Sequence, residues 1–393
     1  MGWVASLLVL GCGDSKDGTK PVDAGGLNQG GDDDAAASGG TSGSGGKPGT
    51  SGGNATSGSD STGNSGNAGR ASGGTAGSGG RTGTGGAGGS AGTGVCDQTL
   101  DNQACWSSYD VSDLNDSLAL PQYHGAIFDG QHMLFVNAAS NDDYQLQLDT
   151  KGDFMHAWKQ FNTGPNIGGG YRGGTFDGRY VYLTPTQAES NGAGGFNYDT
   201  IAARYDTQAD FTAADAWSSV NLTQKSGAVD LTVPGYRGAA FDGRYVYFAP
   251  SSVGDTASGN ATRYDTMGQF DDEASWTDFD LTTFAPHAIG FEGAVHAGKY
   301  IYYVPGSYEL AARYDTTAPF DDEASWTTFD TQTLDPDAWN FDGGVFDGRY
   351  LYFVPRQNNH GFVARYDTQA TFEDASSWSI YNPIGTGFTD SVS

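Results

Sequence analysis

The chain beyond residue 105 is built from one short pattern that occurs five times. Its clearest copies read FDGRYVYLTP at 176–185, FDGRYVYFAP at 241–250 and FDGRYLYFVP at 346–355, with weaker copies at 128–137 and 295–305. A second unit, ARYDT, follows three of the copies, with a near copy, TRYDT, at 262–266 and a worn one at 147–150. A tryptophan that begins an alternating run comes third, at Trp158, Trp217, Trp276, Trp326 and Trp378. Because the three units keep their order at a spacing of about 50–65 residues, the pattern predicts a repeat architecture.

Each repeat reads as four β-strands. The pair Asp242-Gly243 separates two runs of alternating aromatic and β-branched residues, and Asp-Gly favours the positive-φ turn of a tight hairpin. The ARYDT unit and the tryptophan run supply the third and fourth strands. Four antiparallel strands per repeat, without a convincing helix, are typical of a β-propeller blade, and the repeated aromatic rings are then explained by packing between neighbouring blades.

A sixth copy of the last strand stands ahead of the first complete repeat. The residues Cys105 to Asp110, CWSSYD, match Ser325 to Asp330, SWTTFD. We therefore predict an all-β fold, a five-bladed β-propeller of four-stranded antiparallel blades over residues 96–393, whose ring is closed by the two chain ends. The Trp106 strand then either completes the last blade or adds an outer strand beside Trp378.

The repeat resembles the kelch type of propeller repeat, in which a glycine-containing hairpin is followed by a Tyr-Asp strand and then a tryptophan. The resemblance covers Trp106 to about Tyr381. Kelch strands often end in Gly-Gly, whereas here Ala249-Pro250 and Val354-Pro355 stand at that place. Other five-bladed propellers, including tachylectin-like lectins and several glycosidase families, are similar in architecture, and architecture does not determine function.

The first quarter of the chain has a different composition. From Ala24 to Gly94 it consists almost entirely of Gly, Ser, Thr, Ala, Asn and Asp without an aromatic residue, which predicts a disordered linker over 12–95. The formal charge of the chain is −28. Residues 1–95 contain five Lys or Arg against seven Asp, so −26 belongs to residues 96–393. This charge repels phosphate backbones and anionic lipid surfaces, so we expect no nucleic-acid partner.

The N-terminus contains a short apolar run, WVASLLVL, followed by Gly11-Cys12. The segment Val9-Leu10-Gly11-Cys12 resembles the lipobox of bacterial lipoproteins. The resemblance implies that residues 1–11 are a signal-peptide-like segment, that Cys12 carries a lipid, and, because Gly13 rather than Asp follows, that the outer membrane or cell surface is the destination. No Lys or Arg precedes the apolar run. The alternatives are a hydrophobic tip without a role and N-myristoylation, whose pattern Met1-Gly2 with Ser6 also fits.

Three cysteines occur in the chain. If Cys12 is acylated, Cys96 and Cys105 remain, and an exported protein would form a disulfide between them. Free thiols are the alternative in a cytosolic chain. The linker of about 70 residues would span on the order of 45 Å as a random coil, enough to hold a folded head away from a membrane.

Polar residues precede the glycine of the first strand in every repeat, but they follow no consensus. They are His124, Arg172, Arg237, Glu292 and Asp342. In a propeller the first strands surround a central channel, so we expect these five side chains to ring its mouth. Nearby loops contribute further candidates, namely His287, Trp339, Asn340, Arg356, Asn358, Asn359 and His360.

Three interpretations of the mouth stay open. In the first, it binds a polar ligand such as a sugar, through His124, Arg172, Arg237, Glu292, Asp342, Trp339, Arg356 and His360. In the second, Glu292 and Asp342 are the carboxylate pair of a glycosidase. In the third, the arginines neutralise these carboxylates in a closed girdle of ion pairs.

Carboxylates also cluster in the loops before the tryptophan strands, at 271–273, 321–323 and 373–374. Calcium could bind there, although the spacing lacks the EF-hand pattern and solvated loop residues are the simpler explanation. We predict no firm metal site and no cofactor. The sequence thus favours a monomeric, surface-tethered binding module for carbohydrate or another envelope component, with a glycoside-processing enzyme or a protein-interaction scaffold as alternatives.

Overall fold

A computed structural model describes residues 7–10, 105–114, 123–138, 144–167, 170–185, 189–190, 196–197, 201–222, 235–253, 256–356 and 361–382. The whole of the predicted linker, the predicted boundary at residue 96, and the sites Cys12, Cys96 and His360 lie outside these ranges. Within them, no helix is long and apolar enough to cross a membrane.

Five four-stranded antiparallel sheets, whose strands pair in chain order, follow one another along the chain. The first contains β3 (Tyr123–Phe128), β4 (His132–Asn137), β5 (Tyr144–Asp149) and β6 (Trp158–Asn162). The second contains β7 (Tyr171–Phe176), β8 (Tyr180–Pro185), β11 (Ile201–Asp206) and β12 (Trp217–Asn221). The third contains β13 (Tyr236–Phe241), β14 (Tyr245–Pro250), β17 (Asn260–Asp265) and β18 (Trp276–Asp280). The fourth contains β19 (Phe291–Ala297), β20 (Tyr300–Pro305), β21 (Leu310–Asp315) and β22 (Trp326–Asp330). The fifth contains β23 (Phe341–Phe346), β24 (Tyr350–Pro355), β25 (Val363–Asp367) and β26 (Trp378–Tyr381).

Short elements connect these strands. Two small hairpins pair β9 (Glu189–Ser190) with β10 (Phe196–Asn197) and β15 (Ser252–Val253) with β16 (Thr256–Ala257). One helical turn, α1, spans Gly164–Ile167. The 3-10 turns are η2 (Val111–Leu114), η3 (Ala214–Ala216), η5 (Glu273–Ser275), η6 (Leu281–Thr283), η7 (Glu323–Ser325), η8 (Thr331–Thr333) and η9 (Ala375–Ser377).

The Asp-Gly hairpins form as the sequence predicts. In the third sheet, Gly243 has a φ of 104°, which a residue with a side chain would adopt only at a cost. The Asp242 carboxylate accepts hydrogen bonds from the backbone N–H groups of Arg244 at 2.8 Å and Tyr245 at 2.7 Å. The turn therefore closes through a side chain that the sequence repeats in four of its five copies.

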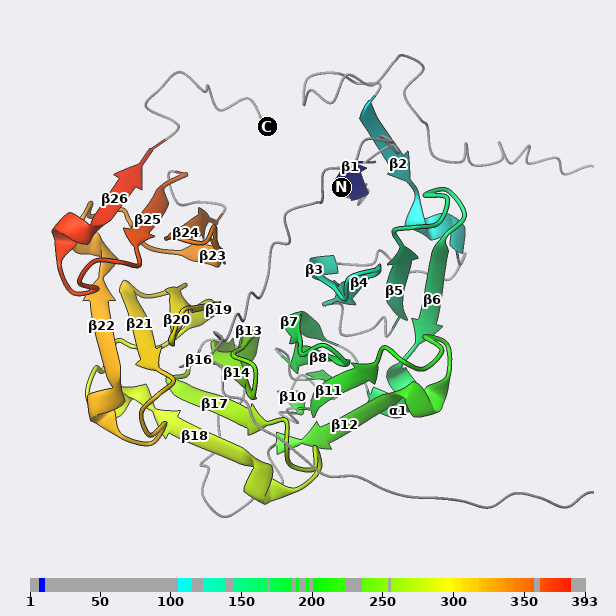
Figure 1. Cartoon of the computed structure of the whole chain (residues 1–393), viewed down its shortest axis with the longest axis horizontal. Coiled ribbons are helices and arrows are strands. Elements are labelled where there is room, and N and C mark those ends of the chain that lie inside the picture. The colour runs from blue at the N-terminus through cyan, green and yellow to red at the C-terminus, as the bar shows by residue number, and fades with distance from the viewer. Residues whose placement is uncertain are drawn as a thin grey trace, which may run out of the picture. The chain divides into compact units, whose positions relative to one another are not determined.

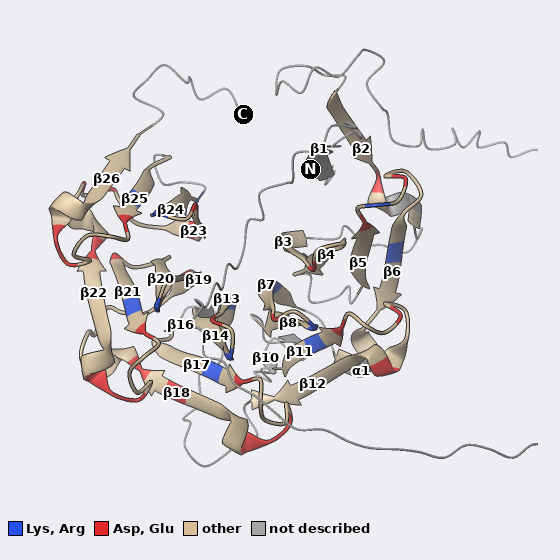
Figure 2. Cartoon of the chain, in the orientation of Figure 1, with Lys and Arg blue, Asp and Glu red and all other residues tan. Residues whose placement is uncertain are grey.

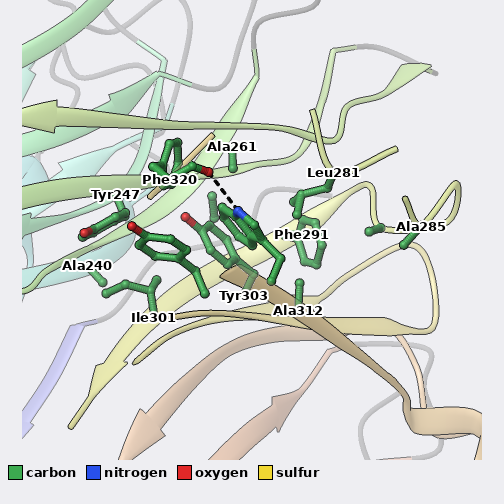
Figure 3. Packing of buried hydrophobic residues seen from close by; sticks show 14 residues of the cluster. Ala240, Tyr247, Ala261, Leu281, Ala285, Phe291, Ile301, Tyr303, Ala312 and Phe320 are labelled. Carbon is green, nitrogen blue, oxygen red and sulfur yellow. Dashed lines mark hydrogen bonds between the residues drawn. The ribbon is translucent and has the colours of Figure 1, made fainter. Parts of the chain in front are cut away.

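The sheets are blades of a β-propeller, arranged with their first strands innermost (Figure 1). Successive inner strands β3, β7, β13, β19 and β23 lie against one another. The core lies between neighbouring blades. Figure 3 shows one such layer, in which Tyr247 of the third blade meets Ile301, Tyr303 and Phe320 of the fourth. The all-β propeller with five four-stranded antiparallel blades, predicted from the repeats, is confirmed.

In the second to fifth blades, the tyrosine of the third strand and the tryptophan of the fourth strand have their polar atoms hydrogen-bonded within their own blade. The Trp326 indole N–H donates to the backbone carbonyl of Phe320 at 2.9 Å, and the Tyr314 hydroxyl donates to that of Ala318 at 2.6 Å. The second, third and fifth blades repeat both bonds. These third-strand Tyr and fourth-strand Trp side chains therefore add packing area with their polar atoms paired, which avoids a cost of about 1–3 kcal/mol each, whereas the buried hydroxyls of Tyr302 and Tyr303 have no hydrogen-bond partner within the described residues.

The predicted closing strand takes a different place from either one expected. Strand β2 (Trp106–Tyr109) pairs with β1 (Leu7–Leu10) and belongs to no blade, because Trp378 begins the strand that completes the fifth. The Tyr109 ring stacks on Trp158 at 5.3 Å, as Phe329 of the fourth blade stacks on Trp378 of the fifth at 4.5 Å. Toward the first blade, β2 thus makes the contact that the outer strand of a preceding blade would make.

The face of the fifth blade that points away from the fourth blade differs from the matching faces of the other blades. Val304 of the fourth blade is fully buried by the fifth, whereas the matching Val354 is 44% exposed. The guanidinium of Arg313 lies between Tyr300 of its own blade and Phe372 of the next, at 4.3 and 4.7 Å from the ring centroids. The matching Arg365 lies over Tyr350 of its own blade at 4.5 Å, beside a cavity of about 400 Å³. Within the described ranges, no ring of another blade covers it.

This contrast predicts unequal effects for the same substitution at two copies of one repeat position. Arg313→Ala should destabilise the chain by about 1–2 kcal/mol, because it removes a cation held between two rings and its aliphatic stem. Arg365→Ala should cost less than about 0.5 kcal/mol, as surface changes do. Urea unfolding followed by tryptophan fluorescence measures both, and equal losses would contradict packing between blades as the source.

Candidate functional site

The five inner strands share an irregularity at the position singled out in the sequence. Each pairs regularly with the second strand of its blade except for a register shift that spans two residues, between Tyr236 and Ala239 in the third blade, for example. The two residues are the variable polar residue and its glycine. The glycine lies in the left-handed region in four blades, with a φ of 71° at Gly238. Such bulges redirect a side chain out of the regular alternation.

The bulges bring the five variable residues together. His124, Arg172, Arg237, Glu292 and Asp342 all line one cavity of about 390 Å³, each with the glycine and the small residue that follow it. The convergence expected from the sequence is therefore present. The strand glycines form much of the lining because inner strands approach closely: a Cβ on Gly238 would lie 3.0 Å from the Cα of Gly293.

Glu292 is the most buried of the five. Its side chain is 3% exposed, and its Oε1 accepts hydrogen bonds from Nη1 of Arg237 and, at 2.7 Å, from Nη1 of Arg356. Burial raises the pKa of the Glu292 carboxyl, and the two guanidiniums oppose that rise. The stem of the side chain lies against Gly306, where a Cβ would come within 2.4 Å of it. Glu292, on the fourth blade, thus joins the third and fifth blades through Arg237 and Arg356.

Arg172 is placed differently. It is half-buried on β7, and among the described residues its guanidinium has no ion pair or hydrogen bond. Its Nε is buried and unpartnered. Burial and the neighbouring cation of Arg237 lower the pKa of Arg172. The closed girdle of ion pairs considered above is therefore present only in part.

The first and fifth blades supply the exposed members of the set, His124 and Asp342. Partial burial of its imidazole and the charge of Arg172 lower the pKa of His124, which favours the neutral form at pH 7. Asp342 makes no side-chain hydrogen bond or ion pair with any other part of the chain that the structure describes. Both polar groups thus face the cavity without a protein partner there.

The remaining predicted residues are spread more widely. Arg356 reaches the mouth through Glu292, although it does not come from an inner strand. Trp339 is 38% exposed and precedes Asn340, whose φ of 63° is unusual for a residue with a side chain, and neither lines the cavity. His287 pairs instead with Glu309 at 2.7 Å.

Sequence reasoning missed Thr184, at the end of β8. Its fully buried hydroxyl donates toward the backbone carbonyls of Arg172 and Gly173, of which the Arg172 oxygen is the nearer, and accepts from the backbone N–H of Gly238 at 3.2 Å. It therefore joins the inner strands of the second and third blades just below Arg172 and Arg237. The signal was available, because Thr184 interrupts a position that is apolar in the other copies of the strand.

The clustered carboxylates of the outer loops have local roles. Asp272, Asp322 and Asp374 each precede a 3-10 turn and accept a hydrogen bond from a backbone N–H two residues on, at 2.9–3.1 Å. Figure 2 shows acidic residues at these outer corners, away from the inner strands. Over the described ranges, no group of three or more His, Cys, Asp or Glu side chains is placed to hold a metal ion.

Comparisons with known proteins found similarity among solved structures alone. No protein-family model matches the chain, and no curated protein matches it. Among solved structures it is similar to one described as the crystal structure of a nidogen/laminin complex, at 12% identity and a TM-score of 0.40, over 66% of this chain and 82% of that one. It is also similar to BamB from Moraxella catarrhalis, at 11% identity and a TM-score of 0.33, over 66% of this chain and 63% of that one. Neither likeness bears on function, and the resemblance to kelch repeats stays a prediction.

Two substitutions at the mouth should have opposite consequences for stability. Glu292→Gln keeps the shape but leaves two close guanidiniums without their shared anion, so we expect a loss of about 1–3 kcal/mol. Arg172→Gln removes an unpaired cation beside Arg237, so stability should stay unchanged or rise slightly. Both are measured by urea unfolding. A comparable loss in the two variants would mean that Arg172 has a structural partner after all.

Proposed function

We propose that the chain is a binding module that takes a polar ligand, carbohydrate or another envelope component, in the mouth of its propeller. The single observation that carries the proposal is the convergence of five polar side chains of four residue types on one cavity of about 390 Å³. That volume lies in the range of sites for small ligands. The side chains differ between blades whereas the backbone around them repeats, which is the arrangement expected of a site set into a uniform scaffold.

The pairing of Glu292 favours binding over glycoside hydrolysis. A glycosidase needs one carboxyl that donates a proton and a second that acts as nucleophile or base. Glu292 accepts hydrogen bonds from Arg237 and Arg356, which occupy its Oε1 and oppose the rise in its pKa that burial causes. Of the two carboxylates, only Asp342 is then available to act as an acid, a base or a nucleophile. The scaffold alternative finds some support in the exposed far face of the fifth blade.

A glycan array probed with the full chain tests the proposal. We expect binding that Ala126→Trp abolishes, because Ala126 is exposed and lines the cavity, so that an indole there would fill it. Ala370→Trp, at an exposed alanine in an outer loop, is the matched control and should bind normally. Bound glycans should be recovered unchanged. Binding that survives Ala126→Trp would move the site elsewhere, and turnover that Glu292→Gln or Asp342→Asn removes would establish the enzyme instead.

The proposed location is the bacterial cell surface or outer membrane, with a lipid on Cys12 as the only membrane contact and a monomeric head. Support comes from the lipobox resemblance, the linker composition and the state of Cys105, which is buried and disulfide-bonded. Disulfides persist in oxidising compartments.

One measurement on the cysteines tests both the proposed lipid anchor and the predicted disulfide. Since the chain has three cysteines and Cys105 is disulfide-bonded, its intramolecular partner is Cys12 or Cys96. Lipidation of Cys12 leaves only Cys96. Peptide mapping of the protein purified from its membrane fraction should therefore find a Cys96–Cys105 bridge and an acylated, N-terminal Cys12. A Cys12–Cys105 bridge would overturn the anchor.

A further inference from the structure

The mouth carries a positive charge that its own residues leave uncompensated. Three arginines, Arg172, Arg237 and Arg356, face two carboxylates, Glu292 and Asp342, while the neutral form of His124 is favoured at pH 7. Its net charge is therefore +1, in a chain whose formal charge is −28. A cationic hollow in an acidic molecule focuses the local potential on anions that can enter it.

The uncompensated positive charge lies at one side of the cavity. Arg237 and Arg356 share the Glu292 carboxylate, which thus serves two cations. Arg172, on the neighbouring blade, has no counter-ion in the described part of the chain, and its Nε is buried without a partner. A half-buried guanidinium beside other cations is stabilised most by an oxyanion, because its planar fork of donors fits two oxygens at once.

The surroundings leave room for such a group. Arg172 is followed by Gly173 and Gly174, which line the same cavity, so the next two residues of the strand add no side chain beside the guanidinium. Asp342, exposed on the fifth blade, is placed to accept hydroxyl hydrogens from the rest of a ligand and to repel a second negative charge. This combination fits a hydroxyl-rich ligand with one anionic group better than a neutral sugar.

We propose that the mouth selects ligands bearing a single oxyanion, such as an acidic sugar, and that Arg172 is the residue that binds the anion. The inference rests on the proposed function, because it names the ligand class of the same site. A carboxylate and a phosphate share the chemistry, so both are included in the test.

The first experiment measures whether anions protect the Arg172 guanidinium from chemical modification. Phenylglyoxal modifies accessible guanidiniums, and peptide mass spectrometry of the full chain gives its rate at Arg172 and at Arg365, an exposed arginine on the fifth blade as the control. Glucuronate, inorganic phosphate or both should slow modification of Arg172 by about tenfold at saturation, whereas glucose should not, and no probe should affect Arg365. Protection by glucuronate alone or phosphate alone identifies the source of the anion. Failure of both to protect Arg172 overturns the inference.

The second experiment separates this inference from the proposed function. On the glycan array, binding should concentrate on acidic glycans, fall about tenfold or more in Arg172→Gln, and rise in Asp342→Asn. Arg365→Gln should bind as the wild type does. Binding to neutral glycans that Ala126→Trp abolishes but Arg172→Gln spares would overturn the anion site and leave the proposed function standing. Protection of Arg172 by anions without any glycan binding would overturn the proposed function and leave an anion site without a carbohydrate role.

Discussion

The packing of each sheet against the next through aromatic rings is the interaction on which the rest of this structure depends. A four-stranded sheet of this size cannot hide both its faces alone, so every blade relies on its neighbour. Tyr302 and Val304 of the fourth blade are nearly inaccessible only because the fifth lies against them. Since this contact recurs between successive blades, it also sets how closely the inner strands approach one another, and therefore the width of the mouth.

That close approach explains why the backbone at the mouth is nearly uniform whereas the polar side chains vary. The backbone there is nearly uniform, with a bulge and a glycine in each inner strand, because a side chain on Gly238 would collide with Gly293. The residue before the glycine is released from packing and can vary. One of these, Glu292, is used to bind two cations, whereas Arg172 and Asp342 remain directed at the cavity. A rigid scaffold thus presents side chains whose identity it does not constrain.

The two ends of the series of blades are unlike. Tyr109 of β2 covers Trp158 of the first blade with the same stacked contact that blades make with each other, together with Val111 of η2. The fifth blade instead presents Val354, Arg365 and a cavity to its far side. The sequence predicted that both chain ends meet at one seam. It found the repeated strand correctly but placed it on the wrong side of the seam, because a strand motif does not say which neighbour it will pair with.

Local pattern and repetition alone were enough to predict the strands, the Asp-Gly turns, the five blades and the five residues that face the channel. Those features depend on residues close in sequence and on a rule repeated in every copy. The local pattern did not predict the pairing of Glu292 with Arg237 and Arg356 or the bond through Thr184, because each joins residues from different blades. It did not predict the isolation of Arg172 either, since that depends on the same contacts between blades. Identical strand signals are compatible with many pairings of charge across a channel. Only the distances imposed by the assembled blades decide which cation meets which carboxylate and which is left for a ligand.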